Sequence, residues 1–175
     1  DGEALDPPSE ELRGDKGVVM EAVKLYGGAL QHAARKLRGD REVVLRAVRQ
    51  YSPALEFASD DMKDDEEIVV SAAKQDGKAL AHASEGLRDS RGVVMEAVTL
   101  AGGALQHASE GLQGDRDVVL EAVRQCGYSL RYASEEARAD KGVVTEAVRQ
   151  WGGALQHASE ALRGDREVVL EAMNR

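Results

Sequence analysis

The sequence is poor in aromatic residues, contains a single cysteine and has no long apolar run. Phe, Trp and Tyr make up 3% of its 175 residues, so a folded core must be built from Val, Leu, Ala and Met. Cys126 has no second cysteine with which to form an intrachain disulfide. No segment approaches the roughly 18 apolar residues of a membrane-spanning helix, so no membrane span is expected.

Basic residues are outnumbered by acids, and they alternate with them along the chain. The formal net charge is -9 at pH 7. A nucleic-acid-binding protein normally carries a basic stripe, and none is visible in this sequence. We therefore expect no nucleic-acid partner. Hydrophobic residues make up 42% and charged residues 31%, which is typical of a soluble folded protein.

A phrase of 25 residues recurs along the chain without insertion or deletion. The copies begin at Asp15, Asp40, Asp65, Ser90, Asp115, Asp140 and Asp165. A fixed period of about 20–50 residues is the signature of a stacked repeat protein. We predict an all-α solenoid, a superhelical array of two-helix (helix-turn-helix) repeats. Its units are the half-repeat 1–14, the full repeats 15–39, 40–64, 65–89, 90–114, 115–139 and 140–164, and the partial repeat 165–175.

Apolar residues within each copy are spaced for two helices. In the first copy Val19, Ala22 and Val23 lie on one stripe of a helix of about ten residues. Asp15 is expected to cap its start by accepting backbone hydrogen bonds, and in the fourth copy Ser90 should do the same. Gly27 and its counterparts are expected to end this helix in the left-handed conformation.

The second helix is expected to run on from Ala29 to Leu37. Its serine column is expected to lie inside the helix as small residues at a close contact. This column comprises Ser59, Ser84, Ser109, Ser134 and Ser159. Stacking of neighbouring repeats should bury the apolar stripes in a continuous core. The residues expected to be most buried are Val19, Val44, Val69, Val94, Val119, Val144, Ala22 and Leu30.

Both ends of the sequence fall in the middle of a repeat. The segment from Gly2 to Asp15 aligns with the segment from Gly152 to Asp165. This pattern favours a piece of a longer chain over a deliberate cap formed by the proline pair at positions 7 and 8. Because proline breaks helices, residues 1–8 are expected to be mostly irregular.

The repeated phrase L-R-x-D-[KR]-x-V-V-x-x-A-V-x-x-x-G-x-A-L-x-x-A-S-E resembles a repeat family catalogued only as a domain of unknown function. That family recurs in unicellular algae, other protists and some intracellular bacteria. The resemblance covers residues 9–175 and is carried by Ala22-Val23, Gly27, Ala29-Leu30, Ala33 and Leu37. It implies an α-helical array with an unknown partner, and it brings no catalytic residues.

One column contains mostly histidine: His32, Phe57, His82, His107, Tyr132 and His157. Metal binding requires ligands that converge on one ion, whereas neighbouring repeats hold these rings about a helix diameter apart, and Phe57 cannot ligate. We therefore expect no metal and no cofactor. Packing between repeats and a ladder of contacts to a partner both remain open for this column, which is the secondary candidate for partner binding.

The sequence offers no candidate for catalysis. The serine column recurs in nearly every copy, whereas a catalytic serine requires one distinct site with a base and an orienting acid. The tripeptide Arg38-Gly39-Asp40, which also occurs in other copies, is explained by a helix end followed by a helix cap. We therefore expect a protein that is not an enzyme.

The most informative column varies while its neighbours stay nearly fixed. It comprises Tyr26, Tyr51, Asp76, Ala101, Cys126 and Trp151, and the position two residues later, which includes Tyr128, varies as well. Variation beside a fixed scaffold is typical of partner contacts, and exposed Trp and Tyr are favoured at binding hot spots. A loosely packed helix end is the alternative. Tyr26, Tyr51, Tyr128 and Trp151 are our candidate partner-binding residues, and some of them are expected to face solvent.

These features predict a non-enzymatic scaffold that binds a protein of unknown identity, as an accessory or recruiting module of a multi-subunit complex. The alternative is a substrate-recruiting arm of an enzyme whose catalytic domain lies outside this chain. The sequence leaves the compartment open, because a soluble protein of an organelle and one of the cytoplasm both fit it.

Overall fold

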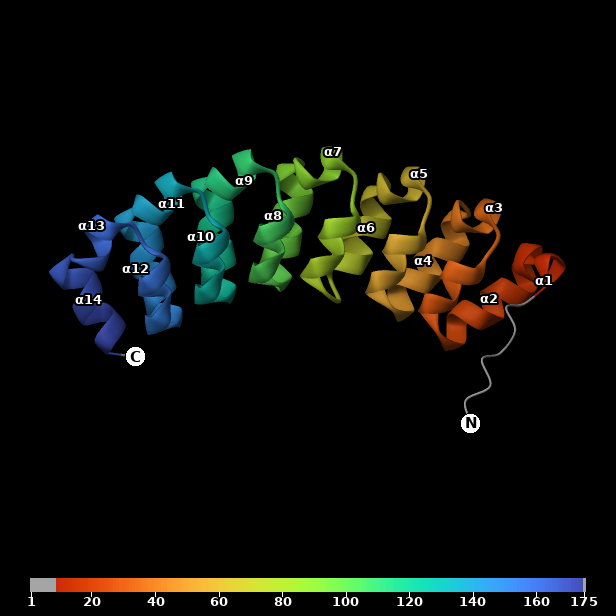
Figure 1. Ribbon diagram of the computed structural model, residues 1–175, viewed down its shortest axis with the longest axis horizontal. Coiled ribbons are helices and arrows are strands. Elements are labelled where there is room, and N and C mark those ends of the chain that lie inside the picture. Colours follow the sequence, from red (N-terminus) through yellow and green to blue (C-terminus); the bar gives the residue numbers. More distant parts are fainter. Residues whose placement is uncertain (1–8, 175) are drawn as a thin grey trace.

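The computed structural model describes residues 9–174. Over these residues the chain is helical, contains no strand and forms an elongated, curved array (Figure 1). The predicted all-α repeat array is thereby confirmed. The expectation that residues 1–8 are irregular falls outside the described residues. No helix between residues 9 and 174 is long and apolar enough to cross a membrane.

Each full repeat contains three helical segments. The long helices are α2 (Lys16–Leu25), α4 (Arg41–Gln50), α6 (Glu66–Ala73), α8 (Arg91–Leu100), α10 (Arg116–Gln125), α12 (Lys141–Gln150) and α14 (Arg166–Met173). The 3-10 helices are η1 (Gly27–His32), η2 (Ser52–Phe57), η3 (Gly77–His82), η4 (Gly102–His107), η5 (Gly127–Tyr132) and η6 (Gly152–His157). The short helices are α1 (Glu10–Gly14), α3 (Arg35–Arg38), α5 (Asp60–Lys63), α7 (Glu85–Arg88), α9 (Glu110–Gly114), α11 (Glu135–Ala139) and α13 (Glu160–Arg163).

The predicted second helix is therefore divided into a 3-10 helix and a short α-helix. The serine column lies at the division, so its predicted place inside a helix is wrong. The hydroxyl of Ser84, for example, accepts a hydrogen bond from the backbone N–H of Leu87 at 3.2 Å. Ser109, Ser134 and Ser159 cap α9, α11 and α13 in the same way. A serine side chain favours this capping position over a helix interior, which explains why the helix restarts there.

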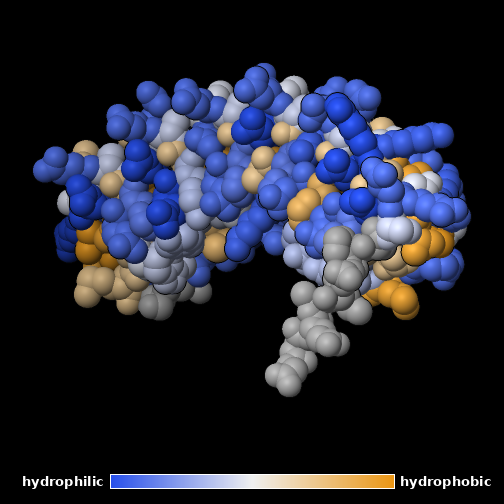
Figure 2. Space-filling view, turned by 45° about the vertical axis from the view of Figure 1, so that its right-hand side comes forward, coloured by the Kyte–Doolittle hydropathy of each residue, from blue (hydrophilic) through white to orange (hydrophobic). Residues whose placement is uncertain are grey.

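The short helices lie along the convex edge of the arch, and the long helices run from that edge toward the concave side (Figure 1). Each interior long helix packs against the long helices on both sides and against two 3-10 helices, as α10 does against α8, α12, η4 and η5. The convex edge is largely hydrophilic on the visible face, and apolar colour gathers toward the two ends of the array (Figure 2).

The predicted core is confirmed with one exception. The side chains expected to be buried include Val44, Val69, Val94, Val119, Val144 and Leu30, all 0% exposed, and Val19 at 6%. Ala22 is only half-buried, contrary to expectation. Its counterpart Ala122 is buried because a long helix packs on each side of α10. Within the described residues no long helix precedes α2.

Glycine at the start of the 3-10 helix permits a close contact between backbones. A Cβ atom at Gly127 would lie 2.4 Å from the carbonyl oxygen of Ala147, in the long helix of the next repeat. At Gly102 the corresponding distance, to the carbonyl oxygen of Ala122, is 2.3 Å. The predicted left-handed conformation is wrong, because no glycine in the described chain has a positive φ. Glycine is required here because a side chain would not fit, and not because the backbone conformation is unusual.

The second repeat tests this explanation, because Ser52 takes the place of glycine. Ser52 is 5% exposed and belongs to η2, which packs against α6. The helix α6 has 8 residues, whereas α4 has 10, and it ends at Ala73. The early end of α6 is consistent with the extra space that a side chain requires at this contact.

The caps of the long helices also link one repeat to the next. Asp40 accepts hydrogen bonds from the backbone N–H groups of Glu42 and Val43, and Lys16 of the preceding repeat lies 2.9 Å from it. The hydrogen bond from Lys16 lowers the pKa of Asp40 below its ordinary value, against the opposing effect of burial. The equivalent pairs are Arg41 with Asp65, Arg91 with Asp115, Arg116 with Asp140 and Lys141 with Asp165.

This ladder of ion pairs is interrupted between the third and fourth repeats. Ser90 replaces the capping aspartate, and its side chain makes no capping hydrogen bond, so the prediction that it caps α8 is wrong. The residue that would face it from the third repeat is Glu66, an acid in a column of Lys and Arg. The two exceptions occur together, which avoids placing a glutamate next to an aspartate.

The paired exception predicts that the missing rung can be rebuilt. We expect the double variant Glu66→Arg, Ser90→Asp to have a free energy of unfolding about 0.5 kcal/mol higher than the added effects of the two single substitutions predict. This is a typical value for an exposed ion pair. Ser90→Asp alone should gain less, because the new carboxylate meets Glu66. A double-mutant cycle measured by urea unfolding checks this. Additive effects of the two substitutions would show that the rung does not couple the repeats.

Candidate partner-binding surface

The variable column lies in the link between each long helix and its 3-10 helix. Tyr26, Ala101 and Trp151 all have extended backbone, with φ between -147° and -154° and ψ between 96° and 109°. Any residue can adopt this conformation, so the backbone places no constraint on the side chain. The link lies where the long helices end, on the side of the arch away from the short helices (Figure 1).

The four aromatic candidates are exposed to solvent. The exposed fractions are 53% for Tyr26, 38% for Tyr51, 36% for Tyr128 and 40% for Trp151. Large aromatic side chains are usually buried in soluble proteins, where each can bury 150–250 Å². Their exposure agrees with the expectation from the sequence, whereas their part in binding a partner stays a prediction.

Two of the aromatic residues form a pair near the N-terminal end of the array. The ring centroids of Tyr26 and Tyr51, from successive repeats, lie 5.6 Å apart. The ring of Tyr26 covers Gly28, where a Cβ atom would lie 2.4 Å from the Cζ of Tyr26. Because Gly28 has no side chain, the ring of Tyr26 can pack directly against its backbone.

The other aromatic residues belong to a larger cluster in the fifth and sixth repeats. The ring of Tyr128 lies 5.6 Å from Trp151, 5.4 Å from His157 and 6.1 Å from Tyr132, measured between centroids. The contacts with His157 and Tyr132 are edge-to-face, an arrangement that aromatic rings favour. The two columns singled out in the sequence therefore meet in space. We call this cluster, together with Arg131, the aromatic surface.

Arg131 is a member of this surface that sequence reasoning missed. Its guanidinium carbon lies 5.0 Å from the centre of the Tyr128 ring and 5.3 Å from that of Tyr132, within the range of a cation–π contact. It also donates a hydrogen bond to the hydroxyl of Tyr128. One signal was available in the sequence, because Arg131 is the only basic residue in its column: Gln31, Glu56, Ala81, Gln106, Arg131 and Gln156.

The middle of the array carries no such ring in the variable column. Asp76 uses its carboxylate to accept a hydrogen bond from the backbone N–H of Lys78 at 2.9 Å, which caps η3. Ala101 follows in the next repeat, and beside it Gly103 faces open space. The exposed aromatic residues are thus divided into an N-terminal pair and a C-terminal cluster.

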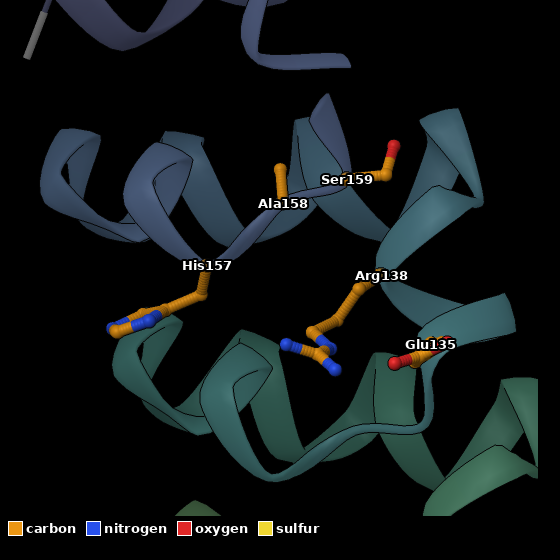
Figure 3. Close-up of a pocket in the computed structure, with 5 residues that line it drawn as sticks. All are labelled: Glu135, Arg138, His157, Ala158 and Ser159. Carbon is orange, nitrogen blue, oxygen red and sulfur yellow. The ribbon is translucent and has the colours of Figure 1, made fainter. Parts of the chain in front are cut away.

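A cleft of about 340 Å³ continues the aromatic surface between the fifth and sixth repeats. Glu135 and Arg138 line it from α11, and His157, Ala158 and Ser159 line it from the next repeat (Figure 3). Burial lowers the pKa of His157, and the charges of Arg131 and Arg138 lower it further, so the ring is neutral at pH 7. Its buried Nε2 atom has no hydrogen-bond partner among residues 9–174.

The rest of the histidine column lies along the junctions between repeats. His32 is exposed, whereas Phe57, His82, His107 and Tyr132 are half-buried. Burial, followed by the charges of His82 and Arg88, lowers the pKa of His107. In the described part of the chain, no three His, Cys, Asp or Glu residues come together as a metal site would require. Half-burial at a junction suits packing between repeats, and at His157 it also suits contact with a partner.

Three segments of the chain match a known family, the Domain of unknown function (DUF4116). They are residues 40–88, 90–136 and 140–175, which together make up most of the chain. Each segment covers one and a half to two of the 25-residue repeats. No curated protein matches the chain. No solved structure matches it either.

The position of the Trp151 ring leads to a prediction that fluorescence can check. A Cβ atom at Gly153 would lie 2.3 Å from Cζ2 of Trp151, so Gly153→Ala should push the indole off the backbone. Because Trp151 is the only tryptophan, its emission should move to longer wavelength. The matched control is Gly103→Ala, where nothing lies within 4 Å, and emission should not change. Unaltered emission in Gly153→Ala would show that the indole ring does not pack against Gly153.

Proposed function

We propose that this chain, which belongs to the family described as Domain of unknown function (DUF4116), is a non-enzymatic scaffold that holds a protein partner. The partner binds the aromatic surface, formed by Tyr128, Arg131, Tyr132, Trp151 and His157. In this proposal the array is an accessory or recruiting module of a larger assembly. The regular repeats set the spacing, and the variable column supplies the specificity.

The observation that carries the proposal is the convergence of these side chains on one exposed surface. Tyr128 contacts rings from its own 3-10 helix and from the following repeat. Trp, Tyr and Arg are the residues most enriched at binding hot spots. Because the rings are already packed against one another, little side-chain entropy is lost when a partner covers them. Such a surface favours binding over the single polar site that catalysis requires.

The charges of the surface favour a partner of a particular kind. The protein is acidic overall, with a net charge of -9, yet Arg131 and Arg138 lie within or beside the aromatic surface and His157 is neutral. Glu135 lines the same cleft as Arg138. The apolar rings therefore supply most of the binding energy, and the arginines orient a partner segment that carries an acidic or carbonyl group.

Affinity purification with matched variants tests this proposal. The parent and the double variant Tyr128→Ala, Trp151→Ala are immobilised and exposed to native extract from cells that produce the protein. Hot-spot truncations typically cost 2 kcal/mol or more, so the variant should recover the partner at least about tenfold less efficiently. Quantitative mass spectrometry of the bound proteins measures the difference, and circular dichroism checks that both proteins fold alike.

The N-terminal pair provides the control, because it offers the same chemistry elsewhere on the array. The double variant Tyr26→Ala, Tyr51→Ala removes two rings whose exposure is similar to or greater than that of Tyr128 and Trp151, and it should retain the partner. If this variant loses the partner and Tyr128→Ala, Trp151→Ala keeps it, the aromatic surface is not the binding site. Equal recovery by all three proteins would contradict the proposal for both groups of rings.

A further inference from the structure

The short helix α3 is strongly basic, whereas each of its counterparts in the other repeats is acidic or without net charge. Its sequence, Arg-Lys-Leu-Arg, contains three basic residues and no acid. Arg35 is the only basic residue in its column, which otherwise contains Glu10, Asp60, Glu85, Glu110, Glu135 and Glu160. Lys36 is likewise the only basic residue in the next column. A charge reversal at one copy of an otherwise regular array requires a local explanation.

The two arginines of α3 line a cleft at the junction between the first and second repeats. The cleft has a volume of about 260 Å³, and its other walls are Phe57, Ala58, Ser59 and Asp60. The Nε of Arg38 and the Oγ of Ser59 are both buried there, and neither has a hydrogen-bond partner within the described residues. Buried polar atoms are normally paired, because an unpaired one costs free energy. The unpaired Nε recurs at Arg13, Arg88 and Arg138, so it is a feature of the whole column, whereas Ser59 is the one serine of its column whose hydroxyl is buried without a partner in the described residues. The Oγ of Ser59 is therefore suited to an acceptor that arrives from outside.

The next two junctions show which group satisfies this serine. The hydroxyl of Ser84 donates to the carboxylate of Asp64 at 2.5 Å, and that of Ser109 donates to Asp89 at 2.5 Å. At the first junction the equivalent of these aspartates is Gly39. A Cβ atom built on Gly39 would lie 3.3 Å from the Oγ of Ser59. The space that a carboxylate occupies at two junctions is therefore free of a side chain at this one.

We propose that the cleft formed by Arg35, Arg38 and Ser59 binds a carboxylate group from an acidic peptide segment. The carboxylate takes the place that Asp64 and Asp89 hold at the following junctions. The hydroxyl of Ser59 donates to it, and Arg35 and Arg38, which line the same cleft, supply two positive charges. Arginine presents donors in a planar fork that matches a carboxylate. Asp60 is the one acid in the lining, and the two arginines outweigh it.

This carboxylate site is independent of the aromatic surface. It lies between the first and second repeats, whereas the aromatic surface lies in the fifth and sixth, and either one can fail without the other. The site also explains why α3 is basic in an acidic protein, since an acid at position 35 would repel the ligand.

Nuclear magnetic resonance of the arginine side chains tests the carboxylate site directly. The parent protein is titrated with acetylated triglutamate, and the Nε–H signal of each arginine is followed. We expect a saturable shift of the Arg38 signal at millimolar peptide. Arg88 is the internal reference, because it occupies the same column but has Glu85 in place of Arg35, and Asp89 already fills the carboxylate position beside Ser109. Its signal should hardly move. Equal shifts of both signals would overturn the proposal.

Two variants sharpen the test without removing buried side chains. Arg35→Glu restores the charge found in every other repeat and should weaken peptide binding at least about tenfold. Gly39→Asp supplies the carboxylate from within the chain, so it should abolish binding and raise the melting temperature. Gly164→Asp is the matched control, because its nearest neighbours are backbone oxygens at 3.7 Å and 3.9 Å rather than a serine, and it should leave binding unchanged.

Three further results would contradict the carboxylate assignment. The first is undiminished peptide binding by Gly39→Asp, which would show that the carboxylate does not sit beside Ser59. The second is equal loss of binding in Gly39→Asp and Gly164→Asp, which would reflect net charge alone. The third is saturation of the Arg38 signal by inorganic phosphate under conditions in which the peptide causes no shift, because the ligand would then be a phosphate.

Discussion

The backbone contact between the 3-10 helix of one repeat and the end of the long helix of the next sets the spacing of the array. At Gly27, Gly102, Gly127 and Gly152 a Cβ atom would come within 2.4 Å of a carbonyl oxygen. Because most repeats bring their neighbour this close, valines and alanines can fill the space between long helices and are fully buried there. A core with few aromatic residues is a consequence of this constraint, since bulky rings do not fit between backbones so close together.

The helical array and most of its core could be predicted from the sequence, because the 25-residue period and the apolar spacing determine which side chains meet. The details of individual columns could not. The glycine column suggested a left-handed helix end, but its backbone conformation is an ordinary one. Glycine is needed because the long helix of the next repeat leaves no room for a side chain. The serine column suggested a helix interior, and it instead caps a separate helix. Ser90 looked like a cap and makes no capping bond, and the residue that would face it is Glu66 where other repeats have Lys or Arg.

The candidate sites lie where the contacts between repeats place little constraint on a column. Where the backbone is extended and unconstrained, as at Tyr26 and Trp151, the side chain varies between copies and is exposed. The aromatic surface was foreseen only in part. The sequence identified its rings as two separate columns, and only the fold brings Tyr128 against His157. Comparison between copies also revealed the basic charge of α3, so an array of repeats provides its own reference for what is unusual.

Hydrogen exchange on the variant Gly127→Ala tests the importance of the close contact most directly. The added methyl group must displace the carbonyl of Ala147, and overpacking of this kind costs about 1–3 kcal/mol. The account predicts a loss of protection centred on η5 and α12, with the first two repeats unaffected, because each repeat contacts only its neighbours. Protection equal to that of the parent protein at η5 and α12 would contradict the claim that this contact sets the spacing of the array.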